Sequence, residues 1–411
     1  MKKRVSVILL LLFFILKGNA EHLKCVEIDN YDQVNYDACY LQFPGEHKRF
    51  EALYRKLEYL RRGGEGIVNI LHVGGSHVQA GVLSHRLRCN FSQMMPERPQ
   101  SRGLMFPFGA IRTNAPKDYG FSASGSWKSS RCLDRTPSYP LGLSGAVAEA
   151  CSEDCSLSLS VDSIFAFQRL RVLGNPMGGQ CRPLIVTVDN DTLHAEQVGK
   201  DYLFTFPNPV GECSIIFDGV KRDSISFVLN GVWPERDGVG ITYTGSGING
   251  ASVPSWLRCE LFAEELNRLC PPDLVIFGIG INDANTSTAK FNPESFKENY
   301  RQLINNILSV NPNAAFLFVT NNDCWLRVGR RRRVFNTNGS VVEQAMKELA
   351  QEFNGAVFDQ FQVMGGLGSS NKWVREGLMN RDHIHFLSAG YQLMGDLIYN
   401  AFVQDYNDYL R

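Results

Sequence analysis

The chain has 411 residues, and its 42 Lys and Arg side chains balance 42 Asp and Glu, so the formal net charge at neutral pH is zero. This balance creates no long-range field that would attract the protein to nucleic acid or to an anionic membrane. Hydrophobic residues make up 44% of the chain, which excludes a disordered protein, and the length allows one large domain or two moderate ones. Solenoids and polytopic membrane proteins are excluded because there is no fixed-period repeat and only one long apolar run.

That apolar run lies at the N-terminus. Basic residues 2–4 precede apolar residues 5–16, and the small residues Gly18 and Ala20 follow. This order is typical of a secretory signal peptide, so we expect a signal over residues 1–20 that is cleaved after Ala20. An uncleaved anchor is the alternative, but the run is short for a bilayer. We therefore expect a periplasmic or secreted protein with no membrane contact after cleavage.

Eleven cysteines fit an extracytoplasmic compartment, because disulfides persist there. No Cys or His spacing matches a zinc site, so we expect no bound metal. The cysteines are expected to be structural, either in bridges or as buried thiols. Their odd number leaves at least one unpaired, and the spacing does not determine the pairing.

The first strong structural signal lies between residues 67 and 87. Residues 67–73 form an apolar run that ends at the glycine pair before Ser76, and apolar residues then recur at helical spacing at Val78, Val82 and Leu87. This pattern predicts a strand, a tight turn and a helix.

The pattern changes between residues 113 and 237. Short β-prone runs alternate there with Gly, Pro, Asn and Asp, which is typical of an antiparallel β-structure. The runs are residues 157–161, 184–188, 202–206, 214–217 and 224–228. We predict an all-β sandwich domain over residues 113–237. No low-complexity linker marks its ends, so we expect it to pack against its host.

Alternating strands and helices return after about residue 240. The predicted strands are residues 239–243, 274–279, 314–320 and 356–358, and the predicted helices are 296–308, 341–353 and 389–402. Apolar strands separated by helices predict an α/β fold with a parallel sheet that is covered on both faces. This α/β domain is discontinuous and consists of residues 21–112 and 238–411.

Two polar residues lie where such a fold binds ligands. Ser76 follows the first strand on a glycine turn, at the carboxyl edge of the sheet and at a helix N-terminus whose N–H groups can stabilise an anion. Asn282 follows the strand at 274–279, and its amide can donate to an oxyanion. Taken singly, each residue has a structural interpretation as a helix cap or a turn residue.

A third segment lies just before the last predicted helix. Asp382 precedes His385 by three residues, so its carboxylate can accept the Nδ1–H of the imidazole and leave Nε2 to take a proton from a serine. A surface histidine near a helix start is the structural alternative. Gly250 lies in a loop after the strand at 239–243 and has no functional meaning by itself.

Taken together and in this order, the four segments resemble the SGNH, or GDSL-type, hydrolase family, whose sequence blocks carry Ser, Gly, Asn and His. The resemblance covers residues 65–112 and 238–403 and implies a flavodoxin-like parallel sheet flanked by helices. Ser76 matches the nucleophile of the family, and Asp382 with His385 matches its Asp-x-x-His block.

The resemblance also implies the chemistry of the site. His385 would act as the general base for Ser76, and Asp382 would fix its tautomer. The oxyanion hole would consist of the backbone N–H groups of Ser76 and Gly250 and the side-chain amide of Asn282. No metal and no organic cofactor is needed for this chemistry.

The chain departs from the family at the residue before the nucleophile, where the family usually has Asp and this sequence has Gly75. The triad is not affected, but the rigidity of the nucleophile turn is in question. The Gly-x-Ser-x-Gly elbow is absent, which argues against the α/β-hydrolase fold.

The signal peptide and the sandwich between the first two blocks resemble bacterial peptidoglycan O-acetylesterases and related carbohydrate O-acetylesterases, in which the insert resembles a carbohydrate-binding module. The resemblance implies a serine esterase that removes O-acetyl groups from peptidoglycan or another glycan. Tyr119, Phe121 and Trp127 would either offer rings to sugars or form the core of the insert. The alternatives are an O-acyltransferase with the same triad and a catalytically decayed glycan-binding protein.

Other polar residues carry weaker signals. We expect the arginine run at residues 330–333 to be a solvated loop. His72, His77 and His383 flank the candidate catalytic positions, and we expect them to be structural. The sequence determines neither the glycan, nor the position of its acetyl group, nor the oligomeric state.

Overall fold

The computed structural model describes residues 22–328 and 332–411. The predicted signal peptide lies outside the described residues. Within the described part of the chain, no helix is both long and apolar enough to span a bilayer.

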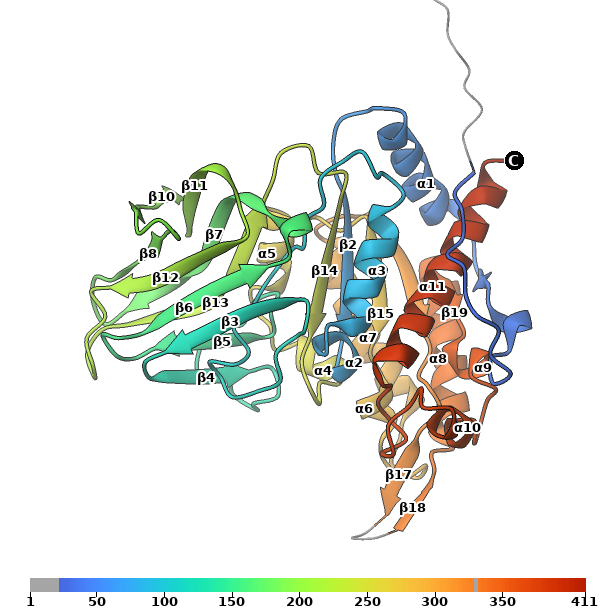
Figure 1. The fold of residues 1–411 in the computed structure, drawn as a ribbon. Coiled ribbons are helices and arrows are strands. Elements are labelled where there is room, and N and C mark those ends of the chain that lie inside the picture. The colour runs from blue at the N-terminus through green and yellow to red at the C-terminus, as the bar shows by residue number, and fades with distance from the viewer. Residues whose placement is uncertain (1–21, 329–331) are drawn as a thin grey trace, which may run out of the picture.

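The described residues form a central six-stranded sheet with the spatial order β1-β19-β16-β15-β2-β14 (Figure 1). Its strands are β1 (Leu41–Gln42), β2 (Val68–Gly74), β14 (Ile241–Gly247), β15 (Leu274–Gly278), β16 (Ala315–Val319) and β19 (Ala356–Phe358). The short edge strand β1 is antiparallel to β19, and the other pairs are parallel. The parallel strands follow the chain order 2-1-3-4-5, which is the flavodoxin-like order. The predicted α/β fold is confirmed.

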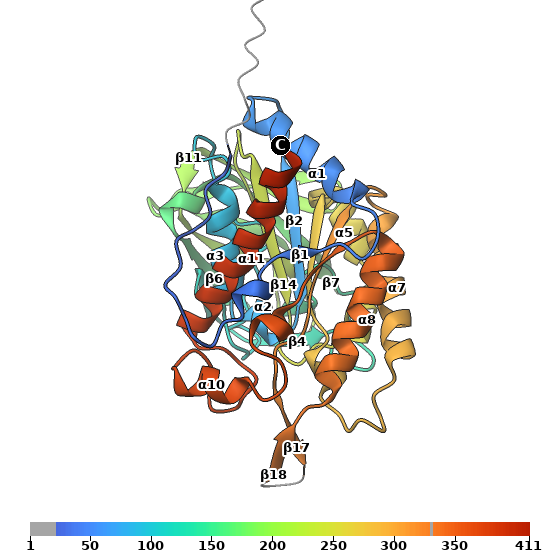
Figure 2. The same cartoon turned by 90° about the vertical axis from the view of Figure 1, so that its right-hand side faces the viewer.

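Helices cover both faces of this sheet (Figure 2). One face packs against α1 (Lys48–Arg61), α3 (Val82–Ser92) and α11 (Ser388–Tyr409). The other packs against α5 (Phe262–Leu269), α7 (Pro293–Leu308) and α8 (Asn338–Phe353). Successive strand residues alternate between the two faces, so Ile276 lies in the first core and Phe277 in the second. This double burial is why the strands appear as continuous apolar runs in the sequence.

Short helices and turns connect these elements. They are the helices α2 (Ser76–Gln79), α4 (Val253–Trp256), α6 (Ile281–Ala284), α9 (Gln360–Val363) and α10 (Ser370–Arg375), and the 3-10 turns Tyr36–Ala38 and Ser163–Phe165. The helices α2, α4 and α6 lie close to one end of the sheet, where β2, β14 and β15 finish (Figure 1).

Between β2 and β14 the chain forms two antiparallel sheets, with the orders β10-β11-β7-β13-β5-β4 and β3-β6-β12-β8-β9. Their strands are β3 (Tyr119–Ser124), β4 (Trp127–Arg131), β5 (Ala146–Ala150), β6 (Ser156–Val161), β7 (Phe167–Met177), β8 (Arg182–Val186), β9 (Thr192–Leu193), β10 (Glu196–Val198), β11 (Asp201–Val210), β12 (Glu212–Asp218) and β13 (Ser226–Glu235). The five β-prone runs of the sequence overlap β6, β8, β11, β12 and β13.

The sandwich shares a hydrophobic core with the α/β domain. Leu143 and Val228 from the sandwich region belong to the same buried cluster as Val73 of β2, Trp256 of α4 and Phe262 of α5. Burial of apolar area of this kind favours a fixed arrangement over a flexible tether. The insert is therefore packed against its host, as the absence of a low-complexity linker predicts.

A buried carboxyl group lies at this junction. Glu265 of α5 is 2% exposed, and its Oε2 accepts a hydrogen bond of 2.6 Å from the backbone N–H of Leu143. Burial raises the pKa of Glu265 from 4.5 to about 7, against the opposing effect of that N–H. Because the folded state binds the proton more tightly than the unfolded state, the stability that this group provides is complete below pH 4.5 and is lost as the pH rises through 7.

We therefore expect the wild type to lose about 3 kcal/mol of unfolding free energy between pH 4.5 and pH 8 relative to Glu265→Gln, because the amide does not titrate. Urea denaturation of both proteins across this range measures the difference. The exposed Glu260→Gln serves as the matched control and should follow the wild type. Parallel pH profiles for wild type and Glu265→Gln would contradict the expectation.

The predicted arginine loop at residues 330–333 lies partly outside the described residues, which omit residues 329–331. Arg332 and Arg333 are exposed as expected, but they do not form a loop. Arg332 and Arg333 belong to β18 (Arg332–Phe335), which pairs with β17 (Trp325–Val328) in an antiparallel hairpin rather than a loop. Trp325 packs on Phe335 across this hairpin, with ring centroids 5.5 Å apart. This cross-strand aromatic pair stabilises the hairpin. The sequence does not indicate a hairpin, because an arginine run is typical of a solvated loop.

The sequence allows the cysteines to be either in disulfide bridges or buried as thiols. All eleven lie in the described residues and are free thiols, and seven of them are buried. The seven buried cysteines behave as small apolar side chains.

Candidate active site

The sheet topology brings the candidate residues to one edge. Along the chain, β2, β14 and β15 are the first, second and third parallel strands, and in the sheet β2 lies between the other two. The connection from β2 to β14 therefore crosses the sheet in the opposite direction from the connections that follow it. Ligands bind at such a point, outside the carboxyl ends of the strands. Ser76 begins α2 after β2, and Asn282 lies in α6 after β15, so both occur at this position.

A continuous chain of hydrogen bonds joins Ser76, His385 and Asp382. The Oγ of Ser76 lies 2.8 Å from Nε2 of His385, although the two residues are 309 positions apart. The Nδ1 of His385 lies 2.8 Å from Oδ2 of Asp382. This is the geometry in which an imidazole accepts a proton from a hydroxyl while a carboxylate holds its other nitrogen.

The local loop keeps Asp382 ionised. Its Oδ1 accepts hydrogen bonds from the backbone N–H groups of Ile384 at 2.8 Å and His385 at 3.0 Å. Burial alone would raise the pKa of Asp382, but the hydrogen bonds from the side chain and backbone of His385 and from Ile384 outweigh it and hold the pKa well below its usual range. The carboxylate therefore stays charged at neutral pH and fixes the Nδ1–H tautomer of His385.

The three residues predicted to form the oxyanion hole, Ser76, Gly250 and Asn282, line the same cavity. Ser76 is the first residue of α2, where N–H groups have no intrahelical acceptor. Gly250 has a φ of +83°, a left-handed conformation that favours glycine and sets the direction of its N–H. Asn282 donates one Nδ2–H to the carbonyl of Ala251 at 2.8 Å, which fixes its amide and leaves the second N–H of that nitrogen. Ser76, Gly250, Asn282 and His385 line one cavity of about 870 Å³.

The turn before the nucleophile is held without an aspartate. The carbonyl of Gly75 accepts the N–H groups of Val78 at 3.2 Å and Gln79 at 3.0 Å, and the carbonyl of Gly74 accepts the indole N–H of Trp256 at 3.3 Å. A Cβ at Gly75 would lie only 3.2 Å from Nδ2 of Asn282. Glycine at position 75 therefore leaves room for the Asn282 amide directly beside the nucleophile. Backbone hydrogen bonds hold the turn in place of an aspartate side chain.

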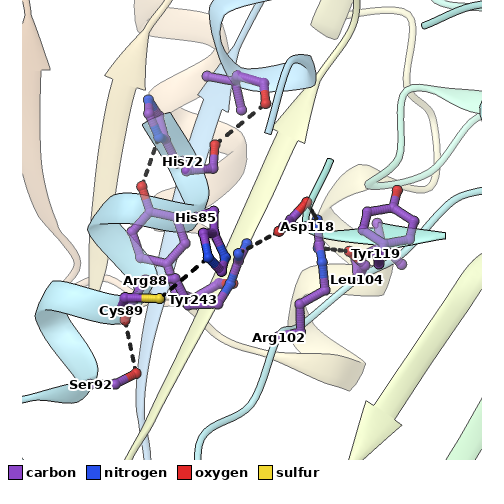
Figure 3. Close-up of polar contacts among 12 residues, drawn as sticks. His72, His85, Arg88, Cys89, Ser92, Arg102, Leu104, Asp118, Tyr119 and Tyr243 are labelled. Atoms are coloured by element: carbon purple, nitrogen blue, oxygen red, sulfur yellow. Dashed lines mark hydrogen bonds and ion pairs between the residues drawn. The ribbon is translucent and has the colours of Figure 1, made fainter. Parts of the chain in front are cut away.

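The neighbouring histidines have structural partners. His77 packs beside His385, with ring centroids 5.4 Å apart, and its Nδ1 lies 2.9 Å from the hydroxyl of Tyr391. Burial, and then the charge of His385, lower the pKa of His77 to about 3, so it is neutral at pH 7. His72 lies 2.7 Å from the hydroxyl of Tyr243 (Figure 3), and burial lowers its pKa to about 3 as well.

The remaining flanking histidine faces another part of the structure. His383 stacks on Trp325 of β17, with ring centroids 4.3 Å apart and an interplanar angle of 17°. The backbone N–H of Trp325 also donates to the carbonyl of His383 at 3.3 Å. His383 therefore joins the hairpin to the loop that carries Asp382.

Sequence reasoning missed Gln79, which joins two walls of the cavity. Its Oε1 accepts the N–H of Asn249 at 2.6 Å, and its Nε2 donates to the carbonyl of Asn114 at 2.6 Å and to the hydroxyl of Thr113 at 3.3 Å. Gln79 is 3% exposed. The side chain thereby holds the loop of Gly250 and the segment that leads into the sandwich, and nothing in the sequence relates these three positions.

The aromatic residues proposed for sugar stacking lie away from the cavity. Tyr119 belongs to the buried core of the sandwich, and Phe121 and Trp127 pack partly buried against the same core. None of the three lines the cavity at Ser76. The alternative that they form the core of the insert is therefore the better one. Among the described residues, no group of three or more His, Cys, Asp or Glu side chains is arranged to hold a metal ion.

A comparison with protein families gives one match. Residues 223–393 match the model of the GDSL-like lipase/acylhydrolase family, a stretch that includes Gly250, Asn282, Asp382 and His385 but not Ser76. None of the curated proteins matches the chain.

One solved structure has a similar fold over most of the chain. A peptidoglycan O-acetylesterase superposes with a TM-score of 0.71 and 17% identity, over 90% of this chain and 99% of that chain. An acetyl xylan esterase, AlAXEase, matches with a TM-score of 0.31 and 16% identity, over 40% of this chain and 82% of its own. A family 3 carbohydrate esterase from Talaromyces cellulolyticus matches with a TM-score of 0.30 and 18% identity, over 43% and 75%.

The high-scoring superposition extends through both the α/β domain and the sandwich, because it covers nine-tenths of the chain. The family match covers the part of the α/β domain that carries the candidate base His385 and two of the three candidate oxyanion residues, Gly250 and Asn282. Residues 223–393 of this protein are therefore similar to the GDSL-like lipase/acylhydrolase family, and the fold of the chain is similar to that of a peptidoglycan O-acetylesterase.

Proposed function

We propose that the protein is a periplasmic or secreted serine esterase that removes O-acetyl groups from a polysaccharide, peptidoglycan or another glycan. The observation that carries this proposal is the hydrogen-bonded series Ser76–His385–Asp382 at the edge of the 870 Å³ cavity. The location rests on the predicted signal peptide. The substrate class is supported by the likeness of the whole fold, sandwich included, to a peptidoglycan O-acetylesterase.

The geometry suggests the following reaction. The Oγ of Ser76 attacks the acetyl carbonyl while Nε2 of His385 takes its proton, and Asp382 stabilises the resulting imidazolium. His385 then returns the proton to the sugar oxygen as the ester C–O bond breaks, which leaves an acetyl group on Ser76. Water, deprotonated by the same imidazole, releases acetate and restores the serine. The oxyanion of each tetrahedral intermediate is bound by the donors of Ser76, Gly250 and Asn282.

Asn282 provides a test of the oxyanion hole. We expect Asn282→Ala to lower kcat by about a hundredfold to a thousandfold with little change in KM, because the lost N–H acts on charge that develops only in the transition state. Steady-state kinetics with a chromogenic acetyl ester measures both constants. A control melt should show that the variant is folded, since it also loses the bond to Ala251. A raised KM with unchanged kcat would refute this role.

The proposed function is tested by acetate release. Wild type and Ser76→Ala are incubated with O-acetylated peptidoglycan and with acetylated xylan, each with and without an added sugar acceptor. The proposal expects free acetate from at least one polymer with wild type alone. Acetyl transfer that requires the acceptor would instead indicate an O-acyltransferase. Equal glycan binding by both proteins, with no cleavage of any acetyl ester, would indicate a glycan-binding protein.

A further inference from the structure

The residues that line the active-site cavity carry little charge. Among the described residues that line it, none is Asp or Glu, and Lys117 is the one with a permanent charge. The polar neighbours of Lys117 in this lining include the amides Asn114, Asn249 and Asn380. The cavity therefore offers one cation and several neutral hydrogen-bonding groups, and no lining carboxylate competes for that cation.

Lys117 is carried by a segment that is fixed at both ends. At one end, Gln79 donates to the carbonyl of Asn114 at 2.6 Å. At the other end, the carboxylate of Asp118 accepts hydrogen bonds from Arg88 at 2.6 Å and Arg102 at 3.3 Å (Figure 3). The side chain of Asp118 is only 2% exposed, so this anchor is desolvated and strong.

The ammonium group of Lys117 itself is not used in the fold. The residue is exposed, and within the described part of the chain no protein group accepts a hydrogen bond from its Nζ or forms an ion pair with it. Because its backbone is held in place, Lys117 presents an unpaired cation in the cavity that contains Ser76. There the ammonium group is available to a bound substrate. Fixing the backbone in advance also lowers the entropy cost of binding.

We propose that Lys117 makes the protein selective for acidic glycans, that is, for O-acetylated polysaccharides with a carboxylate on the acetylated sugar or on its neighbour. This inference rests on the proposed esterase function and specifies its substrate class. Lys117 binds the carboxylate of the glycan, while the triad acts on the acetyl ester. Lys117 is a specificity residue and takes no part in the transfer of protons.

The test compares two forms of one polymer. O-acetylated polygalacturonate carries carboxylates, and the same polymer with its carboxylates converted to N-methyl amides is neutral. A small neutral ester, 4-nitrophenyl acetate, reports on the triad alone. The variants are Lys117→Gln, which removes the charge, and Lys117→Arg, which keeps it. The matched control is Lys24→Gln, an exposed lysine between Leu23 and Val26, which are bonded to the distant end of α11.

We expect wild type to prefer the acidic polymer. Lys117→Gln should lower kcat/KM for that polymer by about fivefold to tenfold, which is the usual effect of losing one partly exposed charge-assisted hydrogen bond. Activity on the neutral polymer and on 4-nitrophenyl acetate should not change. Lys117→Arg and Lys24→Gln should retain the preference. In 1 M salt the preference of wild type should shrink, because the Debye length falls to about 3 Å.

The outcomes separate the two proposals. If wild type and Lys117→Gln have the same ratio of acidic to neutral activity while both cleave 4-nitrophenyl acetate, the selectivity inference is overturned and the esterase proposal stands. If wild type cleaves none of the three substrates, the proposed function fails and the inference with it.

Discussion

Replacing Ser76 with alanine is expected to lower kcat for 4-nitrophenyl acetate by about 10⁴-fold or more, because the reaction then lacks its nucleophile and retains only the oxyanion donors and substrate binding. The expectation depends on the distance of 2.8 Å between the Ser76 hydroxyl and the His385 imidazole. The effects of substituting residues that act as a unit are not additive. The double variant Ser76→Ala/His385→Ala should therefore be only slightly slower than Ser76→Ala.

A matched serine controls for unspecific effects. Ser309 is exposed directly after α7, and Ser309→Ala should have wild-type activity. Thermal unfolding of both variants should match the wild type, since the Ser76 hydroxyl bonds only to His385 among the described side chains. If Ser76→Ala kept more than a tenth of the wild-type kcat, another residue would be the nucleophile.

The second large effect is on stability. We expect Asp118→Ala to reduce the free energy of unfolding by about 3–5 kcal/mol, because it leaves two buried guanidinium groups without a counter-charge. The side chains of Arg88 and Arg102 are 0% and 4% exposed. Burial by itself raises the pKa of Asp118, but the charges of Arg102 and Arg88 outweigh it and lower the pKa. The carboxylate is therefore ionised and compensates charge that the fold has removed from water.

Urea denaturation with intrinsic fluorescence measures this loss. Asp408→Ala is the matched control, because Asp408 forms an exposed ion pair with Arg411 at 2.9 Å, and such a pair contributes about 0–1 kcal/mol. The double variant Asp118→Leu/Arg88→Met should recover part of the loss, since it removes a buried charge together with its partner. A loss below about 1 kcal/mol for Asp118→Ala would mean that water or another group reaches the arginines.

Much of the fold was predictable because its signals are local. The runs at β2, β15 and β16 are continuous and apolar, and buried parallel strands require such runs. β4 was not predicted because its residues, from Trp127 to Arg131, are mostly polar and give no clear alternation. β17 and β18 were not predicted either, since the stabilising contact between Trp325 and Phe335 crosses the hairpin.

The candidate site was predictable to the extent that it lies at strand ends. Ser76 and Asn282 follow buried strands, and parallel strands bring their carboxyl ends to one edge. The spacing of Asp382 and His385 is local and implies their hydrogen bond. Gln79 and Lys117 have no such signal, because their positions depend on where a long insert leaves and re-enters the sheet.

The central claim is that His385 activates Ser76 as a nucleophile. The most direct measurement is reaction with an organophosphorus ester such as paraoxon, followed by peptide mass spectrometry of wild type and His385→Ala. The account predicts a diethylphosphoryl adduct on the peptide that contains Ser76 in wild type and a rate of labelling that falls by orders of magnitude without the imidazole. An adduct on a different residue, or equal labelling of the two proteins, would contradict it.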